Sequence, residues 1–202
     1  NSGIANAATG TIGLENARLT AEIVAQHIGC AQEDVLVAST GVIGQQLDIT
    51  PFKTGVPALH EELKRTGSTN ESGHKAACAI MTTDTVPKEY AISYISADPA
   101  FEGCVFTVGG MAKGSGMIMP NMATMISALT SDAPVPAELL HEALLGAVGK
   151  SFNKVTVDGD TSTNDTCVLF ASGKATEGRD KSAFTKESVA YAEFKKALCE
   201  VT

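Results

Sequence analysis

The segment 109–132, GGMAKGSGMIMPNMATMISALTSD, constrains the fold of this 202-residue chain more than any other stretch. Its first part combines glycines and a serine around Lys113, which predicts a flexible loop, and residues 125–129 form an apolar run that predicts a buried strand. Thr124 stands where this loop enters the strand. Strand packing would fix such a threonine from one side, while the small residues leave room for a substrate on the other. The segment therefore makes Thr124 a candidate nucleophile.

The composition limits the class of protein and its partners. With 44% hydrophobic and 19% charged residues, the chain can form a large core in one domain or two small ones. The net charge of -8 argues against a nucleic-acid partner, and no apolar run approaches the roughly 20 residues that span a bilayer. The five cysteines are widely spaced and lack CxxC or Cys/His ligand spacing. They predict reduced thiols in a cytoplasm-like compartment and no metal site.

Hydrophobic patterns predict the secondary structure. Helical periodicity covers residues 15–28, 52–65, 137–152 and 185–200, with Gly29 expected to end the first helix. Short apolar or alternating runs predict strands over 34–38, 89–96, 104–108, 125–129, 154–157 and 166–171, with 89–96 and 104–108 paired as a hairpin. The hairpin signals argue against a purely parallel sheet. We therefore expect an α/β fold of the α+β type, with helices layered on a mixed sheet.

Two polar segments follow predicted apolar elements. Ser39, Thr40 and Gly41 come after the predicted strand 34–38 and offer a hydroxyl beside a backbone N–H, the two donors that an oxyanion hole needs. The alternative is a simple glycine turn. The segment 82–85, TTDT, has the composition of a polar pocket wall, and the alternative there is a hydrogen-bonded loop that caps a helix.

Two further motifs resemble a calcium-binding loop and a phosphate-binding loop, but neither fits the pattern of such a site. The loop 158–165, DGDTSTND, resembles a calcium-binding loop, but Thr163 and Leu169 stand where an EF-hand needs glycine and glutamate. The loop is expected to be structural or to face a substrate. The glycines of 109–116 lack the order of a phosphate-binding P-loop. The sequence therefore predicts neither a metal nor an organic cofactor.

A nucleophilic Thr124 needs a base. The four histidines lie apart from the Ser/Thr-rich segments, which argues against a Ser-His-Asp triad. A threonine at a chain N-terminus uses its own α-amine, whose pKa of about 7.7–8 suits a base near neutral pH. That solution requires cleavage between Ala123 and Thr124, by attack of the Thr124 hydroxyl on the Ala123 carbonyl.

Five motifs, taken together and in order, resemble the ornithine acetyltransferase (glutamate N-acetyltransferase) family, the self-cleaving enzymes of arginine biosynthesis. They are NSGIANAATG, ASTGVIGQ, AIMTTDTVPK, GGMAKGSGMIMPNMATM and VDGDTSTND, and the similarity extends over residues 1–173. The resemblance implies an Ntn-hydrolase-like αββα architecture and cleavage between Ala123 and Thr124. Residues 1–123 would then belong to an α chain and residues 124–202 to a β chain. Family members are longer, so both parts are expected to be incomplete in an internal fragment.

The resemblance also implies roles for individual residues. Thr124 corresponds to the nucleophile, and Thr40 and Gly41 correspond to the oxyanion-hole pair. Lys113 and Thr82 correspond to residues that contact the substrate, with Thr83 as a close rival of Thr82.

The implied activity is a ping-pong acetyl transfer through an acyl-enzyme. N-acetylornithine gives its acetyl group to Thr124, and glutamate then accepts it; some family members also use acetyl-CoA as the donor. The resemblance implies an α/β heterotetramer in the cytoplasm or the mitochondrial matrix, with no cofactor and no nucleic-acid or membrane partner. The alternatives are a related self-processing aminopeptidase or amidase and a non-catalytic ligand-binding module in which the glycine loop is only a turn.

Overall fold

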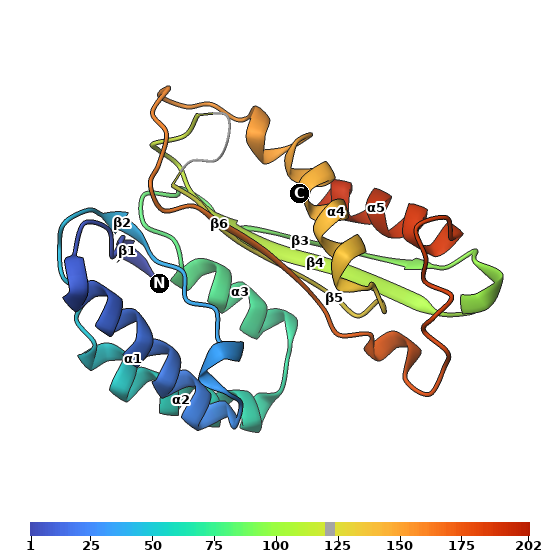
Figure 1. Ribbon diagram of the computed structural model, residues 1–202, viewed down its shortest axis with the longest axis horizontal. Coiled ribbons are helices and arrows are strands. Elements are labelled where there is room, and N and C mark those ends of the chain that lie inside the picture. Colours follow the sequence, from blue (N-terminus) through green and yellow to red (C-terminus); the bar gives the residue numbers. More distant parts are fainter. Residues whose placement is uncertain (120–123) are drawn as a thin grey trace.

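The computed structural model describes residues 1–119 and 124–202, and its ribbon is shown in Figure 1. Its main helices and strands, in chain order, are β1 (Ser2–Ile4), α1 (Gly10–Ile28), β2 (Thr40–Val42), α2 (Thr50–Thr66), α3 (Asn70–Ala79), β3 (Lys88–Ile95), β4 (Val105–Lys113), β5 (Ile126–Ser131), α4 (Ala137–Val148), β6 (Thr166–Ala171) and α5 (Val189–Val201). Within the described ranges, no helix is long and apolar enough to cross a membrane.

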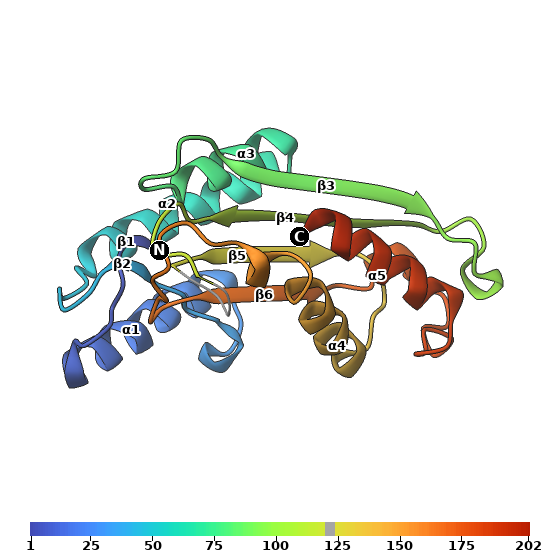
Figure 2. The ribbon, with the colours of Figure 1, turned by 90° about the horizontal axis from the view of Figure 1, so that it is seen from above.

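The larger sheet has the strand order β3-β4-β5-β6 and is mixed. The β3–β4 and β4–β5 pairs are antiparallel, whereas β5 and β6 run parallel. The helices α4 and α5 lie along one face of this sheet (Figure 2). Helices layered on a mixed sheet are the arrangement that the alternating patterns predict, and the hairpin over β3 and β4 is confirmed.

Aromatic side chains fill the space between this sheet and its helices. Phe184 occupies the centre of the cluster, with its ring 5.7 Å from that of Phe101 and 6.4 Å from those of Phe106 and Phe194. These four side chains are fully or almost fully buried. Tilted and edge-to-face pairs of this kind add to the stabilisation that burial provides. The main core therefore fixes β4 and α5 relative to each other.

The N-terminal elements form a second, smaller group. The strands β1 and β2 pair in parallel, with Gly3 opposite Gly41, and α1 packs against α2 (Figure 1). Gly41 has a φ of +137°, and a Cβ atom there would lie 2.2 Å from the carbonyl carbon of Gly3. Only glycine fits at this position, because a side chain would meet the neighbouring backbone. The close approach of the two strands thus depends on Gly41.

Most predicted helices are confirmed, with shifted ends. The helix α1 starts at Gly10 rather than at residue 15, and it ends at Gly29 in the left-handed conformation, as expected. The helix α4 ends at Val148 rather than at residue 152. The helix α5 begins after Ser188, whose hydroxyl accepts a hydrogen bond from the Tyr191 N–H, rather than at residue 185.

Two predicted strands are wrong. The predicted strand 34–38 begins at the last residue of the 3-10 helix Gln32–Asp34, and residues 35–38 belong to no strand. The predicted strand 154–157 likewise begins at the last residue of the 3-10 helix Phe152–Lys154, and residues 155–157 belong to no strand. Leu36 and Val157 are 65% and 59% exposed. These runs have apolar residues typical of strands, but a strand also needs a hydrogen-bonded neighbour. As a consequence, Thr40 and Gly41 belong to β2 itself instead of following an earlier strand.

The predicted loop at the glycine-rich start of the segment 109–132 is also shorter than expected. Gly109 and Gly110 lie inside β4, where Gly110 is paired with Leu129 of β5. A Cβ atom on Gly110 would lie 2.4 Å from Cδ2 of Leu129. The absent side chain therefore leaves room for a core residue, and the loop starts only at Gly114.

Candidate active site

Asp84 is the centre of a hydrogen-bond network between the loop after α3 and the end of β4. Its side chain is fully buried and forms an ion pair with Lys88. Its Oδ1 accepts a hydrogen bond of 2.8 Å from the Gly114 N–H, and its Oδ2 accepts one of 3.3 Å from the Thr82 N–H. Burial alone would raise the pKa of Asp84, but these hydrogen bonds and Lys88 outweigh it and lower the pKa. In the sequence this aspartate is one residue of the polar segment 82–85, and nothing in the local pattern indicates its role.

Lys113 and both candidate threonines border this network. The Lys113 Nζ donates a hydrogen bond of 3.1 Å to the Thr82 Oγ1, and Lys113 is only 3% exposed. Burial lowers the pKa of Lys113, although the nearby Asp84 partly opposes that shift. The Thr83 hydroxyl instead pairs with the Ser115 hydroxyl at 2.6 Å. The structure therefore places Thr82, and not its rival Thr83, beside Lys113.

Thr124 lies directly against the same loop. Gly114 has a φ of +146°, and a Cβ atom there would lie 2.7 Å from the Thr124 carbonyl oxygen. The Thr124 Oγ1 is buried and has no hydrogen-bond partner among the residues that the structure describes. Ala123, the other residue of the predicted cleavage point, lies outside the described residues. Of the predicted site, a hydrogen bond thus joins Thr82 to Lys113, and the Thr124 backbone lies against Gly114, the residue after Lys113.

Thr40 and Gly41 lie on β2, in the N-terminal group of elements. Thr40 is completely buried, and its Oγ1 has no partner in the described part of the chain. Buried hydroxyls are nearly always hydrogen-bonded, so an unpaired one needs an explanation. The hydroxyls of Thr40 and Thr124 are thus both buried and unpaired within the described residues, and an oxygen atom of a bound substrate would give them a hydrogen-bond partner.

The polar loop 158–165 connects β2 with the segment around Thr124. The Asp165 Oδ1 accepts a hydrogen bond of 2.9 Å from the Met125 N–H, next to Thr124. The neighbouring Asn164 donates its Nδ2 to the Ala5 carbonyl at 2.8 Å, and the Ala5 N–H is bonded to the Val42 carbonyl at 2.9 Å. Two adjacent residues therefore hold the strand pair β1–β2 and the start of β5 together. The sequence pattern predicts a polar loop here but not this connection, because the connection depends on pairs of residues far apart in the chain.

A second carboxylate of that loop holds the other side of the Thr124 segment. The two Asp158 carboxylate oxygens accept hydrogen bonds from the backbone N–H groups of Met117 and Ile118, at 2.6 and 2.9 Å. These bonds lower the pKa of Asp158. The described residues contain no group of three or more His, Cys, Asp or Glu that could hold a metal ion. The Asp158 and Asp165 carboxylates of the loop serve as acceptors for backbone N–H groups.

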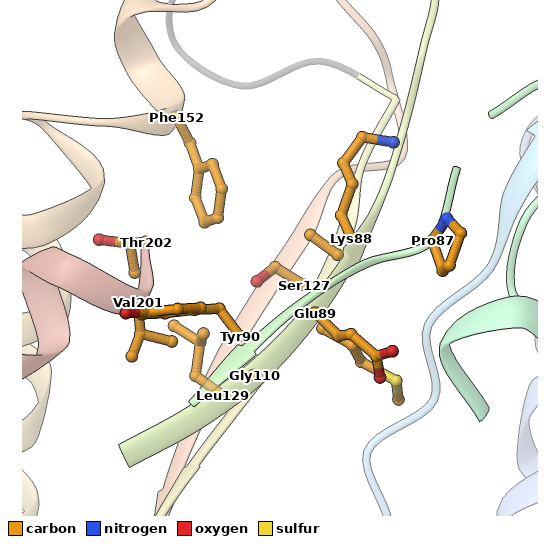
Figure 3. A pocket seen from close by; sticks show the side chains of 12 residues that line it. Pro87, Lys88, Glu89, Tyr90, Gly110, Ser127, Leu129, Phe152, Val201 and Thr202 are labelled. Carbon is orange, nitrogen blue, oxygen red and sulfur yellow. The ribbon is translucent and has the colours of Figure 1, made fainter. Parts of the chain in front are cut away.

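Two neighbouring cavities lie near the network. One, of about 310 Å³, is lined by Lys113, Gly114 and Met125 and is largely apolar elsewhere. The other, of about 330 Å³, lies between the sheet and the ends of the helices, and Figure 3 shows Lys88 and Ser127 on one side of it and Phe152 on the other. None of the predicted site residues that the structure describes lines this second cavity. The cavity beside Lys113 is thus the one that adjoins the candidate site.

Comparison with known proteins gives a consistent result. A model described as the ArgJ family matches residues 1–202. The arginine biosynthesis bifunctional protein ArgJ of Chlorobaculum tepidum is 50% identical over 177 residues, which are 88% of this chain and 41% of that protein. Its namesake from Brucella suis is 45% identical over 202 residues, which are 100% of this chain and 46% of that protein. This chain therefore spans less than half the length of these curated relatives.

A solved structure supports the fold. The crystal structure of the arginine biosynthesis bifunctional protein ArgJ from Bacillus halodurans resembles this chain with a TM-score of 0.50 and 40% sequence identity. The likeness covers 61% of this chain and 59% of that one. It confirms the predicted fold class.

Proposed function

The chain belongs to the ArgJ family, and we propose that it carries the central part of an acetyltransferase of arginine biosynthesis. The enzyme would move an acetyl group from N-acetylornithine to glutamate, with Thr124 as the covalent carrier. The observation that supports this proposal best is that the Thr40 and Thr124 hydroxyls are both buried and unpaired in the described part of the protein. The adjacent residues Asn164 and Asp165 connect the segments that carry them.

The first step of the proposal is self-cleavage between Ala123 and Thr124. The Thr124 Oγ attacks the Ala123 carbonyl carbon, the acyl group moves from nitrogen to oxygen, and water hydrolyses the resulting ester. The step leaves an α chain that ends at Ala123 and a β chain that begins with Thr124. The new α-amine, with an ordinary pKa of about 7.7–8, then acts as the base for Thr124. The tight approach of Gly114 to the Thr124 carbonyl is consistent with a constrained backbone at this point.

The second step is acetyl transfer. The Thr124 hydroxyl attacks the acetyl carbonyl of N-acetylornithine, and the α-amine takes the hydroxyl proton and passes it to the leaving amine of ornithine. The glutamate amine then attacks the acetyl ester and releases Thr124. In both halves the Thr40 hydroxyl and the Gly41 N–H would stabilise the tetrahedral oxyanion, and a donor of this kind is typically worth about 3–4 kcal/mol.

Lys113 and Thr82 supply substrate contacts in this proposal. N-acetylornithine and glutamate share an α-carboxylate, which a buried ammonium group can pair with. Lys113 is held at the cavity by its hydrogen bond to Thr82 and lies near the negative Asp84. We propose that the arriving carboxylate bonds to Lys113 and Thr82 together.

The remaining features of the proposal come from the family. They are acetyl-CoA as a second acetyl donor, no organic or metal cofactor, an α/β heterotetramer after cleavage, and a location in the cytoplasm or the mitochondrial matrix. One relative, from Talaromyces marneffei, is named as mitochondrial. Light scattering of the cleaved protein would test the heterotetramer.

The decisive experiment uses the full-length protein and its Thr124→Ala variant. We expect intact-mass spectrometry to find two chains that meet at Ala123 and Thr124 in the wild type and one chain in the variant. We expect acetyl exchange from N-acetylornithine to glutamate only in the wild type. Thr130→Ala is the matched control, because Thr130 lies on β5, the strand that follows Thr124, and is exposed. An uncleaved and fully active Thr124→Ala protein would refute the proposal, and peptide hydrolysis without acetyl exchange would favour a self-processing aminopeptidase or amidase.

A further inference from the structure

A second group of reactive side chains lies outside the proposed active site, on the helix α3 and the strand β3. His74 and Cys78 are one helical turn apart on α3, so their side chains lie on the same side of the helix. The His74 Nε2 is 3.5 Å from the Cys78 Sγ. The His74 Nδ1 is bonded to the Glu89 carboxylate, which comes from β3. The three groups therefore form a carboxylate–imidazole–thiol chain.

The order of these groups gives each of them a chemical role. The Glu89 carboxylate can only accept, so it fixes the His74 proton on Nδ1 and leaves Nε2 as the acceptor that faces the thiol. An imidazole in that position takes the thiol proton and leaves a thiolate, which is the nucleophilic form of cysteine. The negative Glu89 also stabilises the imidazolium that results. The described part of the chain offers no metal site here, so the arrangement fits thiol chemistry rather than metal ligation.

The group is open to small molecules. Cys78 is exposed, and the side chains of His74 and Glu89 are 55% and 36% exposed. Cys30 and Cys199 are exposed as well, but no histidine nitrogen in the described ranges lies within hydrogen-bonding distance of either sulfur. The chain therefore contains two exposed cysteines that differ from Cys78 by lacking a base.

We propose that Cys78 is a modification site that reacts with low-molecular-weight disulfides. The Cys78 proton moves to the His74 Nε2, and the thiolate attacks one sulfur of the disulfide. The bond between the two sulfurs of the small molecule breaks as a bond to the Cys78 sulfur forms. The second half of the small molecule leaves as a thiolate and takes the proton from His74. Cys78 is oxidised to a mixed disulfide, and half of the small disulfide is reduced to a thiol. This inference is independent of the proposed acetyl transfer.

The test is a brief exposure of the full-length protein to 4,4′-dithiodipyridine, followed by peptide mass spectrometry of the five cysteines that lie in this 202-residue chain. Because every cysteine is measured in the same molecule, Cys30 and Cys199 are internal controls. We expect Cys78 to form its mixed disulfide about tenfold faster than either control, because in the described part of the chain only Cys78 has an imidazole nitrogen placed to take its proton. We expect His74→Gln and Glu89→Gln to slow Cys78 toward the control rate and to leave Cys30 and Cys199 unchanged.

Three results would overturn the inference. The first is a Cys78 rate equal to those of Cys30 and Cys199 in the wild type. The second is a fast Cys78 that keeps its rate in both His74→Gln and Glu89→Gln. The third is a fast release of pyridinethione that persists in Cys78→Ser. A thermal melt of each variant establishes that it is folded, and the two separate replacements keep the test informative when one of them destabilises the protein.

Discussion

The replacement Asp84→Asn tests how the loop after α3 is joined to the end of β4. The wild-type carboxylate accepts hydrogen bonds from the backbone N–H groups of Gly114 and Thr82. Hydrogen bonds to charged groups contribute about 1.5–3 kcal/mol, and neutral ones contribute about 0.5–1.5 kcal/mol. The asparagine amide keeps one acceptor oxygen, while its NH₂ group must face a second donor. One bond is therefore weakened and the other is lost.

The expected cost follows from these contacts. Weakening one bond and losing the other destabilises the protein by about 3 kcal/mol. Loss of the ion pair with Lys88 adds little to this free-energy cost, because the Lys88 side chain is 44% exposed and water can replace the lost carboxylate. The buried Lys113 also loses a neighbouring negative charge, so its pKa should fall further below the ordinary value.

Urea unfolding followed by circular dichroism measures this free energy. Asp180→Asn is the matched control, because Asp180 also accepts hydrogen bonds from a backbone N–H and a hydroxyl, both of Ser182, but is exposed. We expect the control to lose less than about 1 kcal/mol. If Asp84→Asn unfolded at the same urea concentration as Asp180→Asn, then Asp84 would not hold the two loops together.

The pH dependence gives a second check on the same residue. The folded-state pKa of Asp84 is lowered, so the folded protein binds a proton there less readily than the unfolded chain does. The stabilisation is therefore fully present above the unfolded-state pKa of about 3.9 and is lost as the pH falls through the folded-state pKa. We expect a constant difference between wild type and Asp84→Asn from pH 5 to pH 8 (about one unit above that pKa and higher) and a smaller difference below about pH 4. A difference that grows as the pH falls would contradict this assignment.

Three further predictions concern packing and positioning. Gly41→Ala should lower the free energy of unfolding by more than about 2 kcal/mol, because its Cβ would meet the Gly3 backbone. The control Gly44→Ala, with a φ of +81° but open space around it, should lower it by only about 1 kcal/mol in the same urea titration. Equal losses would show that the strands β1 and β2 move apart freely. Phe184→Ala should lower the unfolding free energy by about 3–5 kcal/mol, since it removes the central ring of the main core, and a loss below about 1 kcal/mol would mean that the core refills the cavity. Asp165→Asn should slow self-cleavage of the full-length protein, because it weakens the hydrogen bond from the Met125 N–H, which lies beside Thr124. The rate is measured by the appearance of the two chains on gels. Cleavage at the wild-type rate would show that Asp165 does not position Thr124.

Local patterns in the sequence are sufficient to predict several helices and strands. The 3.6-residue spacing of apolar side chains gave α1 and α2, because a helix forms its hydrogen bonds within its own segment. The alternation over β3 and β4 likewise gave a hairpin, since the two strands are neighbours in the chain. The motif order also predicts Thr82, Lys113 and Thr124 as site residues. In the folded chain Lys113 is bonded to Thr82, and the Thr124 carbonyl lies against Gly114.

Other features depend on partners that lie far away in the chain and could not be read locally. The run 34–38 has strand-like residues but pairs with no strand among the residues that the structure describes, whereas Gly109 and Gly110 resemble a loop and yet pair inside the sheet. The role of Asp84 appears only when Gly114 is beside it, 30 positions further along the chain. The link from Asn164 to Ala5 spans 159 positions. Residue types and local spacing thus specify which groups can react, and the long-range hydrogen bonds and packing specify which of them meet, because those contacts form only when distant segments fold together.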